Sequence, residues 1–379
     1  MKILIVHNTY LSKNIGGEDM VFRNELQLLK KYLGDENVFS YSVSNDDLNI
    51  FSLPFSIWFS FSHYHNIRKI VRDQHIDVVH VHNFFPILTP SVFKAARDAG
   101  ARTVLTLHNY RLWCIAATHY RDGFGICEKC VGQSWQGVWK RCYKKSFFLS
   151  TVVYLAFRFY RLTKAFDQID YFIALTNFQK KKVMQLGIDE KRIFVKPNCL
   201  ELSPVTVSQR QGFVFVGKLQ EDKGIEVLLE AWRELDDRFV LTVIGSGSLE
   251  KTLKSRYRQR NIIFKGQCSR EETIRSIAGS RFLLQPSVWY EPFSLTIIEA
   301  FSCGVPVIAF NRDTRRELIT DGINGFLAEP GELKKVIEKA LNWPDYEKLC
   351  SNALEKSKEF SNHVVAEQQL AIYRRILEA

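Results

Sequence analysis

The sequence predicts an α/β protein with two doubly wound, Rossmann-like domains in tandem. Short apolar runs, typical of strands buried on both faces, alternate with helical patterns along most of the 379 residues. Residues 198–211 interrupt this alternation, since they lack periodicity and contain turn-forming residues. The length also suits two domains of ordinary size. We therefore expect domains at 1–200 and 201–361, facing each other across a deep cleft, and a helix at 362–379 that packs back on the first.

The first domain is expected to begin with a strand from Ile3 to Val6, a loop ending in Gly16 and Gly17, and a helix from Asp19. Its further buried strands are expected at 77–81, 103–107 and 171–175. The second domain repeats the pattern with strands at 213–216, 239–244, 262–264, 282–285 and 305–309. Such alternation favours parallel strands joined by helices, which place ligand-binding loops at the carboxyl ends of the strands.

The composition indicates a folded chain without a membrane span. The hydrophobic content of 46% and charged content of 25% are ordinary for a globular protein. The longest apolar run, Phe147 to Phe157, is well short of the ~20 residues that a span requires. The chain opens directly on a strand pattern and shows no signal peptide. We therefore expect a cytoplasmic protein whose eight cysteines are thiols or metal ligands rather than disulfides.

The positive charge is concentrated in one segment. The net charge is +11, and residues 101–200 carry 17 basic and only 6 acidic side chains. Such a field favours an anionic partner, which could be a phosphorylated substrate, an anionic membrane surface or a nucleic acid.

Two carboxylates in the second domain, Glu291 and Glu299, suggest a binding site. Glu291 would lie in the loop after a strand, Pro292 in the first turn of the next helix, Ser294 at its N-cap and Glu299 on the helix. Carboxylates accept hydrogen bonds from hydroxyls, and unpaired N–H groups at a helix start attract phosphate. These groups are the N–H groups of Phe293, Ser294 and Leu295. An isolated Glu299 would instead be an ordinary solvated helix residue.

Two glycine-containing turns accompany this helix. Gly217 would permit close approach of the backbone, while Lys218 and Lys223 could each offer a charge to a phosphate. Gly245 and Gly247 lie between a strand and a helix start. Taken alone, the lysines would be surface residues and the glycines a tight turn.

In this order, the segments resemble the retaining family 4 glycosyltransferases of the GT-B fold, also called glycosyl transferases group 1. The resemblance is carried by Gly217-Lys-Leu with Lys223-Gly, Gly245-Ser-Gly with Leu249-Glu, the block from Glu291 to Val307, and Asp321 to Leu327. The sequence departs from the family pattern at two positions, because the family usually has Arg at position 218 and Gly at position 294.

The resemblance implies roles for these residues. The first glutamate, Glu291, would contact the donor sugar and Glu299 the ribose hydroxyls. Lys218, Lys223 and the helix start would hold the diphosphate. In the first domain, Gly16 and Gly17 would lie beside the diphosphate and His108 against the sugar. Without the resemblance, His108 would more often be structural, and His80 and His82, which share one face of a strand, would line the core or the cleft.

The resemblance also implies a reaction. A hexose would move from a UDP- or GDP-sugar to a glycan acceptor with retention of anomeric configuration and without a catalytic metal. The leaving diphosphate would help to deprotonate the acceptor, while His108, Glu291, Lys218 and Lys223 position groups and stabilise charge.

A cysteine block lies within residues 110–145, which look like a cysteine-containing insertion found in a subset of the family. Cys114, Cys127, Cys130 and Cys142 have a spacing that could supply a structural zinc site, with His119 as a substitute ligand. Four independent buried thiols explain the pattern equally well.

Two segments suggest what the acceptor is. Aromatic residues between Phe51 and Phe61, and the basic stretch from Lys144 to Lys164 around an apolar helix, suit contact with an anionic bilayer. An ordinary core helix with a solvated basic face would give a similar pattern. We expect a lipid-linked or surface-polysaccharide acceptor and a location in the cytoplasm or on the inner face of the plasma membrane.

Two other functions remain open at this point. One is a basic, zinc-stapled nucleic-acid-binding protein, which would leave the two glutamates unexplained and lacks a recognition-helix or RNA-binding motif; we expect no nucleic acid partner. The other is a two-domain sugar-nucleotide binder without turnover.

Overall fold

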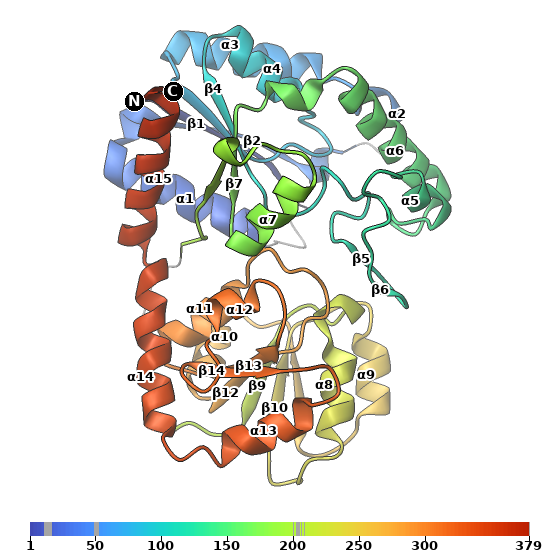
Figure 1. Cartoon of the computed structure of the whole chain (residues 1–379), viewed down its shortest axis with the longest axis vertical. Coiled ribbons are helices and arrows are strands. Elements are labelled where there is room, and N and C mark those ends of the chain that lie inside the picture. The colour runs from blue at the N-terminus through green and yellow to red at the C-terminus, as the bar shows by residue number, and fades with distance from the viewer. Residues whose placement is uncertain are drawn as a thin grey trace. The chain divides into compact units, whose positions relative to one another are not determined.

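The computed structural model describes residues 1–379 except 11–16, 49–52, 200, 202–204, 206, 208 and 379. The chain divides into two compact units (Figure 1). The first unit contains residues 1–119, 128–199 and 362–379, and the second contains 120–127 and 200–361. Each unit is built around one six-stranded sheet. The predicted α/β class with two doubly wound domains is confirmed.

The sheet of the first unit is parallel throughout, with strand order β2-β1-β3-β4-β7-β8. The strands are β1 (Ile3–Thr9), β2 (Val38–Ser44), β3 (Val78–Asn83), β4 (Arg102–Thr106), β7 (Tyr171–Ala174) and β8 (Ile193–Val195). The helices are α1 (Gly17–Leu33), α2 (Leu53–Ser56), α3 (Phe61–Gln74), α4 (Ser91–Asp98), α5 (Gln136–Trp139), α6 (Phe147–Leu162), α7 (Asn177–Gln185) and α15 (Asn362–Glu378).

Alternate residues of β1 pack on opposite faces of this sheet. Leu4 and Val6 join the core that includes residues of α3, α4 and α6, whereas Ile3 and Ile5 join the core that includes residues of α1 and α15. Helix α15 runs beside α1 (Figure 1), and its Tyr373 is fully buried. The last helix of the chain therefore completes the first unit.

The sheet of the second unit is also parallel, with strand order β11-β10-β9-β12-β13-β14. The strands are β9 (Phe213–Val216), β10 (Leu241–Ile244), β11 (Ile262–Gly266), β12 (Phe282–Gln285), β13 (Val307–Phe310) and β14 (Gly325–Ala328). The helices are α8 (Ile225–Trp232), α9 (Glu250–Arg256), α10 (Arg270–Ala278), α11 (Leu295–Ser302), α12 (Arg315–Leu318), α13 (Leu333–Leu341) and α14 (Tyr346–Ser357). The loops that follow β9, β10, β12 and β13 meet at one edge of this sheet.

The sequence analysis placed the insertion at 110–145 in the first domain, but part of the insertion belongs to the second unit. Its hairpin of β5 (Tyr120–Arg121) and β6 (Gly125–Ile126) belongs to the second unit. The physical reason is a shared acceptor: the Tyr120 hydroxyl and the Gly123 N–H both donate to Oε1 of Glu221, over 2.9 and 2.7 Å. A hairpin of this size needs such contacts, because two short strands alone are marginally stable.

No helix in the described part of the chain is both long and apolar enough to cross a membrane.

Candidate functional site

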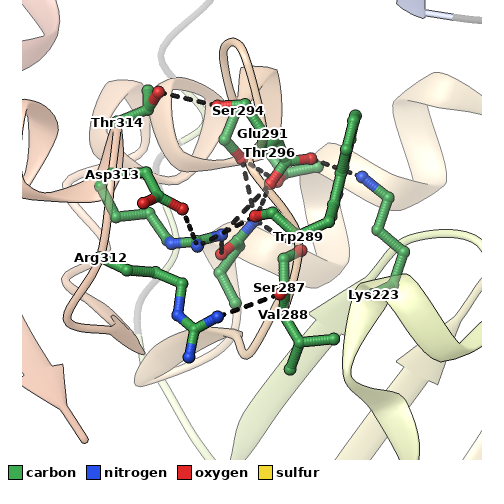
Figure 2. A network of polar contacts seen from close by, with 12 residues as sticks. Lys223, Ser287, Val288, Trp289, Glu291, Ser294, Thr296, Arg312, Asp313 and Thr314 are labelled. Carbon is green, nitrogen blue, oxygen red and sulfur yellow. Dashed lines mark hydrogen bonds and ion pairs between the residues drawn. The ribbon is translucent and has the colours of Figure 1, made fainter. Parts of the chain in front are cut away.

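The predicted glutamate and lysine come together at the edge of the second sheet. Nζ of Lys223, in the loop after β9, lies 2.5 Å from Oε1 of Glu291, in the loop after β12 (Figure 2). Gln285, the last residue of β12, donates to the other oxygen of Glu291. Nη1 of Arg315 lies 3.8 Å from that same oxygen. Two cations and an amide therefore hold this buried carboxylate.

These contacts fix the charge of Glu291. Burial alone would raise the pKa of its carboxyl group, but Lys223 and Arg315 more than offset burial and bring the pKa below its usual value. Glu291 is thus an ionised acceptor at neutral pH, although its side chain is largely removed from water.

A fully buried arginine, which the sequence analysis did not single out, braces this loop. Arg315, at the start of α12, donates to Oε1 of Gln285 over 3.5 Å and to the carbonyl of Trp289 over 3.4 Å, and pairs with Asp313. The neighbouring Thr314 hydroxyl donates to the carbonyl of Glu291 over 2.7 Å (Figure 2). In the sequence, Thr314 and Arg315 are marked as candidates for this site only by their position after β13, a strand of the same sheet.

The helix after Glu291 begins later than the sequence predicted. Helix α11 starts at Leu295, so Pro292 precedes it rather than lying in its first turn. Ser294 does hold the N-cap position, but its hydroxyl bonds to Thr296 instead of to the helix backbone. Within the described part of the chain, we find no acceptor for three backbone N–H groups at this helix start. They belong to Phe293, Ser294 and Leu295.

Glu299 lies on α11 as expected, and it is buried rather than solvated. Nη1 of Arg270, from α10, lies 3.2 Å from its Oε1. Burial raises the pKa of Glu299, and Arg270 offsets this only in part. The structure therefore rejects the interpretation of Glu299 as an ordinary surface carboxylate.

The glycines of the two turns pack loop against loop. At Gly245, where φ is +132°, a Cβ atom would lie 1.9 Å from the carbonyl oxygen of Gly217. At Gly247 a Cβ would lie 2.4 Å from the carbonyl oxygen of Leu219. The loops after β9 and β10 can thus approach only without side chains at these positions, which accounts for the glycines before any ligand is considered. Lys218, in the first of these loops, is exposed.

In the first unit, His108 lies two residues after the end of β4 and is buried. Its Nε2 lies 2.9 Å from Nδ1 of His82, at the end of β3. Gly17 begins α1, whereas Gly16 falls outside the described residues. Next to Gly17, Glu18 accepts hydrogen bonds from Asn109 and Tyr10, each over 3.0 Å.

A buried polar cluster lies beneath His108. Oε2 of Glu25, on α1, accepts from Lys196 over 2.7 Å, and its Oε1 lies 3.3 Å from Nδ1 of His80 and 3.5 Å from Nε2 of His82. Burial alone would raise the pKa of Glu25, but Lys196 and the two imidazoles hold it well below the usual value. Burial lowers the pKa values of His80, His82 and His108. The carboxylate is thus ionised and the imidazoles are neutral at pH 7.

The cluster makes the stability of the first unit sensitive to mild acid. An unfolded chain returns each imidazole to a pKa of about 6.5, so below that pH the unfolded state binds more protons than the folded state. Each of the three histidines then lowers the free energy of unfolding by up to about 1.4 kcal/mol for each pH unit. We expect the melting temperature to fall between pH 7 and 5. The fall should be smaller in His80→Gln and unchanged in the exposed-site control His363→Gln, and a flat profile would contradict the assignment.

The cysteine block is only partly assembled in one unit. All eight cysteines are free thiols. In the first unit, Cys130 lowers the pKa of the Cys114 thiol, and Cys114 and Cys142 raise the pKa of Cys130. Cys127 belongs to the second unit. A structural zinc held by these residues stays a prediction.

Family models match both halves of the chain. Residues 34–203 match the model described as Glycosyltransferase Family 4, and residues 205–360 match the model described as Glycosyl transferases group 1. The chain belongs to the glycosyltransferases. The nucleic-acid-binding alternative would have predicted neither match.

Curated relatives of this glycosyltransferase share only part of its length. An uncharacterized glycosyltransferase of Methanocaldococcus jannaschii is 32% identical over 168 residues, which are 44% of this chain and 47% of the relative. A GDP-mannose-dependent alpha-mannosyltransferase of Corynebacterium glutamicum is 28% identical over 50% of this chain and 46% of its own length. The chain thus spans about half the length of these curated relatives.

Solved structures support the GT-B fold over the whole chain. Anabaena HepE, solved in complex with UDP, has a TM-score of 0.69 and 16% identity, and the match covers 99% of this chain and all of that chain. A sucrose-phosphate synthase from Thermosynechococcus elongatus has a TM-score of 0.72 and 16% identity, with all of both chains covered.

Proposed function

We propose that this glycosyltransferase moves a hexose from a UDP- or GDP-sugar to a glycan acceptor with retention of anomeric configuration. The observation that carries the proposal is the buried, ionised Glu291, paired with Lys223 immediately before the open N–H groups of α11. Carboxylate, ammonium and free N–H groups are the partners that a sugar hydroxyl and a diphosphate need. The UDP complex of HepE and the GDP-mannose dependence of the corynebacterial relative support a nucleotide-sugar donor.

The proposed roles follow from the chemistry of each group. Glu291 accepts hydrogen bonds from hydroxyls of the donor sugar, and Glu299 accepts those of the ribose. Lys218 and Lys223 neutralise the diphosphate together with the N–H groups of Phe293, Ser294 and Leu295. In the first unit, Gly16 and Gly17 would lie against the diphosphate and His108 against the sugar. Gly217, Gly245 and Gly247 keep the loops of the second unit close enough to form the diphosphate site.

The proposed reaction needs no nucleophile from the protein. The bond between the anomeric carbon and the diphosphate oxygen breaks, and the acceptor oxygen bonds to the same face of that carbon. The acceptor proton passes to an oxygen of the departing diphosphate. The protein lowers the barrier by positioning both substrates and by stabilising charge on the leaving group, which Lys223 and the start of α11 can do without a metal.

A donor panel tests the proposal. The purified chain is incubated with a glycan acceptor and with UDP-glucose, UDP-galactose, UDP-N-acetylglucosamine or GDP-mannose, and release of the nucleotide and the anomeric configuration of the product are followed by NMR. We expect one donor to be consumed with retention. Inversion would refute the retaining mechanism, and no binding or turnover with any donor would refute the enzyme assignment.

We further propose that the acceptor is lipid-linked or a surface-polysaccharide precursor and that the chain works at the inner face of the plasma membrane. Helices α5 and α6 pack together in the first unit (Figure 1). These helices and the residue just before α5 carry strongly exposed aromatic side chains. These are Trp135, Trp139, Phe147 and Phe148, of which Trp139 is 72% and Phe148 64% exposed. Basic residues lie between them at 140, 141, 144 and 145. Aromatics flanked by cations suit an anionic bilayer.

Vesicle binding checks this surface. The double change Trp139→Ser with Phe148→Ser should weaken binding to phosphatidylglycerol-containing vesicles at least about tenfold, because burying each aromatic contributes up to roughly 1.5–3 kcal/mol. The control Ile263→Ser removes an exposed apolar side chain from the second unit. Equal binding by the wild type and the double variant would exclude these helices as the membrane contact.

A further inference from the structure

A line of three buried side chains in the first unit ends at His108. Glu25 lies on α1, His82 in β3, and His108 two residues after the end of β4. Oε1 of Glu25 is 3.5 Å from Nε2 of His82, and Nδ1 of His82 is 2.9 Å from Nε2 of His108. All three side chains are largely or fully removed from water. The inner end of this line is a fixed negative charge, since Lys196 holds the other oxygen of Glu25.

The contact between the two histidines is an in-plane hydrogen bond. Their ring planes differ by only 22°, and the ring centres are 5.1 Å apart while the nitrogens are 2.9 Å apart. Rings stacked face to face would be closer at their centres. Both imidazoles are neutral, because burial lowers their pKa values. Each ring therefore carries one N–H, and one nitrogen of the pair donates while the other accepts.

The carboxylate decides which nitrogen donates. Oε1 of Glu25 and Nε2 of His82 are both buried, and neither atom has a well-aligned hydrogen-bond partner among the described residues; their own 3.5 Å contact is electrostatic. Leaving both groups unpaired would be costly, and two lone pairs facing each other would repel. A proton on Nε2 of His82 replaces this repulsion with attraction to the carboxylate 3.5 Å away. Nδ1 of His82 must then accept, so Nε2 of His108 must donate.

His80 does not change this direction. Its Nδ1 also lies 3.3 Å from Oε1 of Glu25, but it bonds to the Tyr373 hydroxyl over 2.7 Å, and its Nε2 bonds to the Thr106 hydroxyl over 2.7 Å. A carboxylate oxygen can accept more than one hydrogen bond. The branch through His80 therefore ends at two hydroxyls and at the Gln369 amide nitrogen, which lies 3.3 Å from Nδ1 of His80. The branch through His82 continues to His108.

We propose that Glu25 and His82 are positioning residues that fix the tautomer of His108, so that His108 offers its Nδ1 lone pair to the ligand. Within the described part of the chain, the hydrogen bond of the His108 ring is made by Nε2, which leaves Nδ1 for the ligand. This inference rests on the proposed function: the ligand group is a hydroxyl of the donor sugar, and it donates a hydrogen bond to Nδ1 of His108. A deoxy or O-methylated sugar at that position would then bind more weakly.

Nitrogen-15 NMR of the full chain, labelled at histidine, tests the tautomers directly. We expect the wild type to carry its protons on Nε2 of both His82 and His108. In Glu25→Gln, the new amide can turn its NH₂ group towards His82, which reverses both tautomers. The control Tyr373→Phe removes a hydrogen bond to His80 from the same cluster and should leave His82 and His108 unchanged. A wild-type His108 protonated on Nδ1 would overturn the proposal, and that result can be read even if Glu25→Gln does not fold.

Activity separates this inference from the function on which it rests. With an active donor, Glu25→Gln should lower kcat/KM about tenfold, and most of that loss should vanish when the donor lacks the hydroxyl that His108 accepts. Expected tautomers without turnover on any nucleotide sugar would refute the proposed function and leave the tautomer assignment standing. Turnover with tautomers that Glu25→Gln does not change would refute the inference alone.

Discussion

Replacing Lys223 with methionine is expected to lower kcat by about 10²–10³-fold. A preorganised charge aimed at a developing anion is worth this much when it is removed. Lys223 is a partly exposed cation that pairs with Glu291, in the loop just before α11. Methionine keeps the length of the side chain and its packing against Trp289, over whose ring the Lys223 ammonium lies at 5.0 Å. The measurement is the initial rate of nucleotide release at saturating donor.

The Lys223 result needs a control for the loss of the ion pair. Glu291 keeps Arg315 and Gln285 in the variant, so the loop should stay folded, and an unchanged melting temperature would verify this. Lys251→Met, an exposed lysine on α9, should retain wild-type rates. If Lys223→Met retained more than a third of the wild-type kcat, charge stabilisation by this lysine would be refuted.

The fold could be predicted from the sequence because its signals are local. Apolar runs such as Ile3 to Val6 and Phe213 to Val216 identify buried strands, and their alternation with helical patterns leaves few topologies. Strands that are partly exposed escaped this reasoning: β2 has an alternating burial pattern, and β8 is three residues long with one fully buried. Periodicity is a weak signal in elements so short or so polar.

The candidate site was predictable only where a motif marked it. Glu291, Lys223 and Glu299 belong to the spaced blocks that carried the family resemblance. Their partners Arg270 and Arg315 are separated from them by sequence distances that no motif spans, and only the folded sheet brings them within ion-pair distance. The start of α11 at Leu295 was also missed, because Pro292 suits both a first helical turn and the loop before it.

The glycine turns show a second limit of sequence motifs, because a matched motif residue can serve packing rather than ligand binding. Gly245 and Gly247 matched a nucleotide-binding pattern, yet the structure gives them a reason that needs no ligand, since side chains there would collide with the carbonyls of Gly217 and Leu219. A motif can therefore identify the right loop while the atoms in it serve the packing of that loop.

Glu299→Ala is expected to remove most of the thermal stabilisation that a nucleotide gives. A ligand that binds only the folded state at 100 times its Kd stabilises by about 2.7 kcal/mol. Losing a charge-assisted hydrogen bond to the ribose should weaken binding by about 1.5–3 kcal/mol, which removes most of that gain. The measurement is the shift in melting temperature with UDP, GDP, ADP and dTDP, each over a range of concentrations.

The controls make this nucleotide experiment decisive. Glu338→Ala removes an exposed glutamate from α13 and should respond to nucleotide as the wild type does. Arg270→Met, which removes the ion-pair partner of Glu299, should weaken binding less than Glu299→Ala does, because the ribose contact itself remains. A single nucleotide that stabilises the wild type and Glu338→Ala but not Glu299→Ala would place the ribose at Glu299 and identify the base. If the wild type and all three variants showed equal shifts in melting temperature, the nucleotide would bind at another site. A ribose contact made by Glu299 cannot be lost without a change in nucleotide affinity.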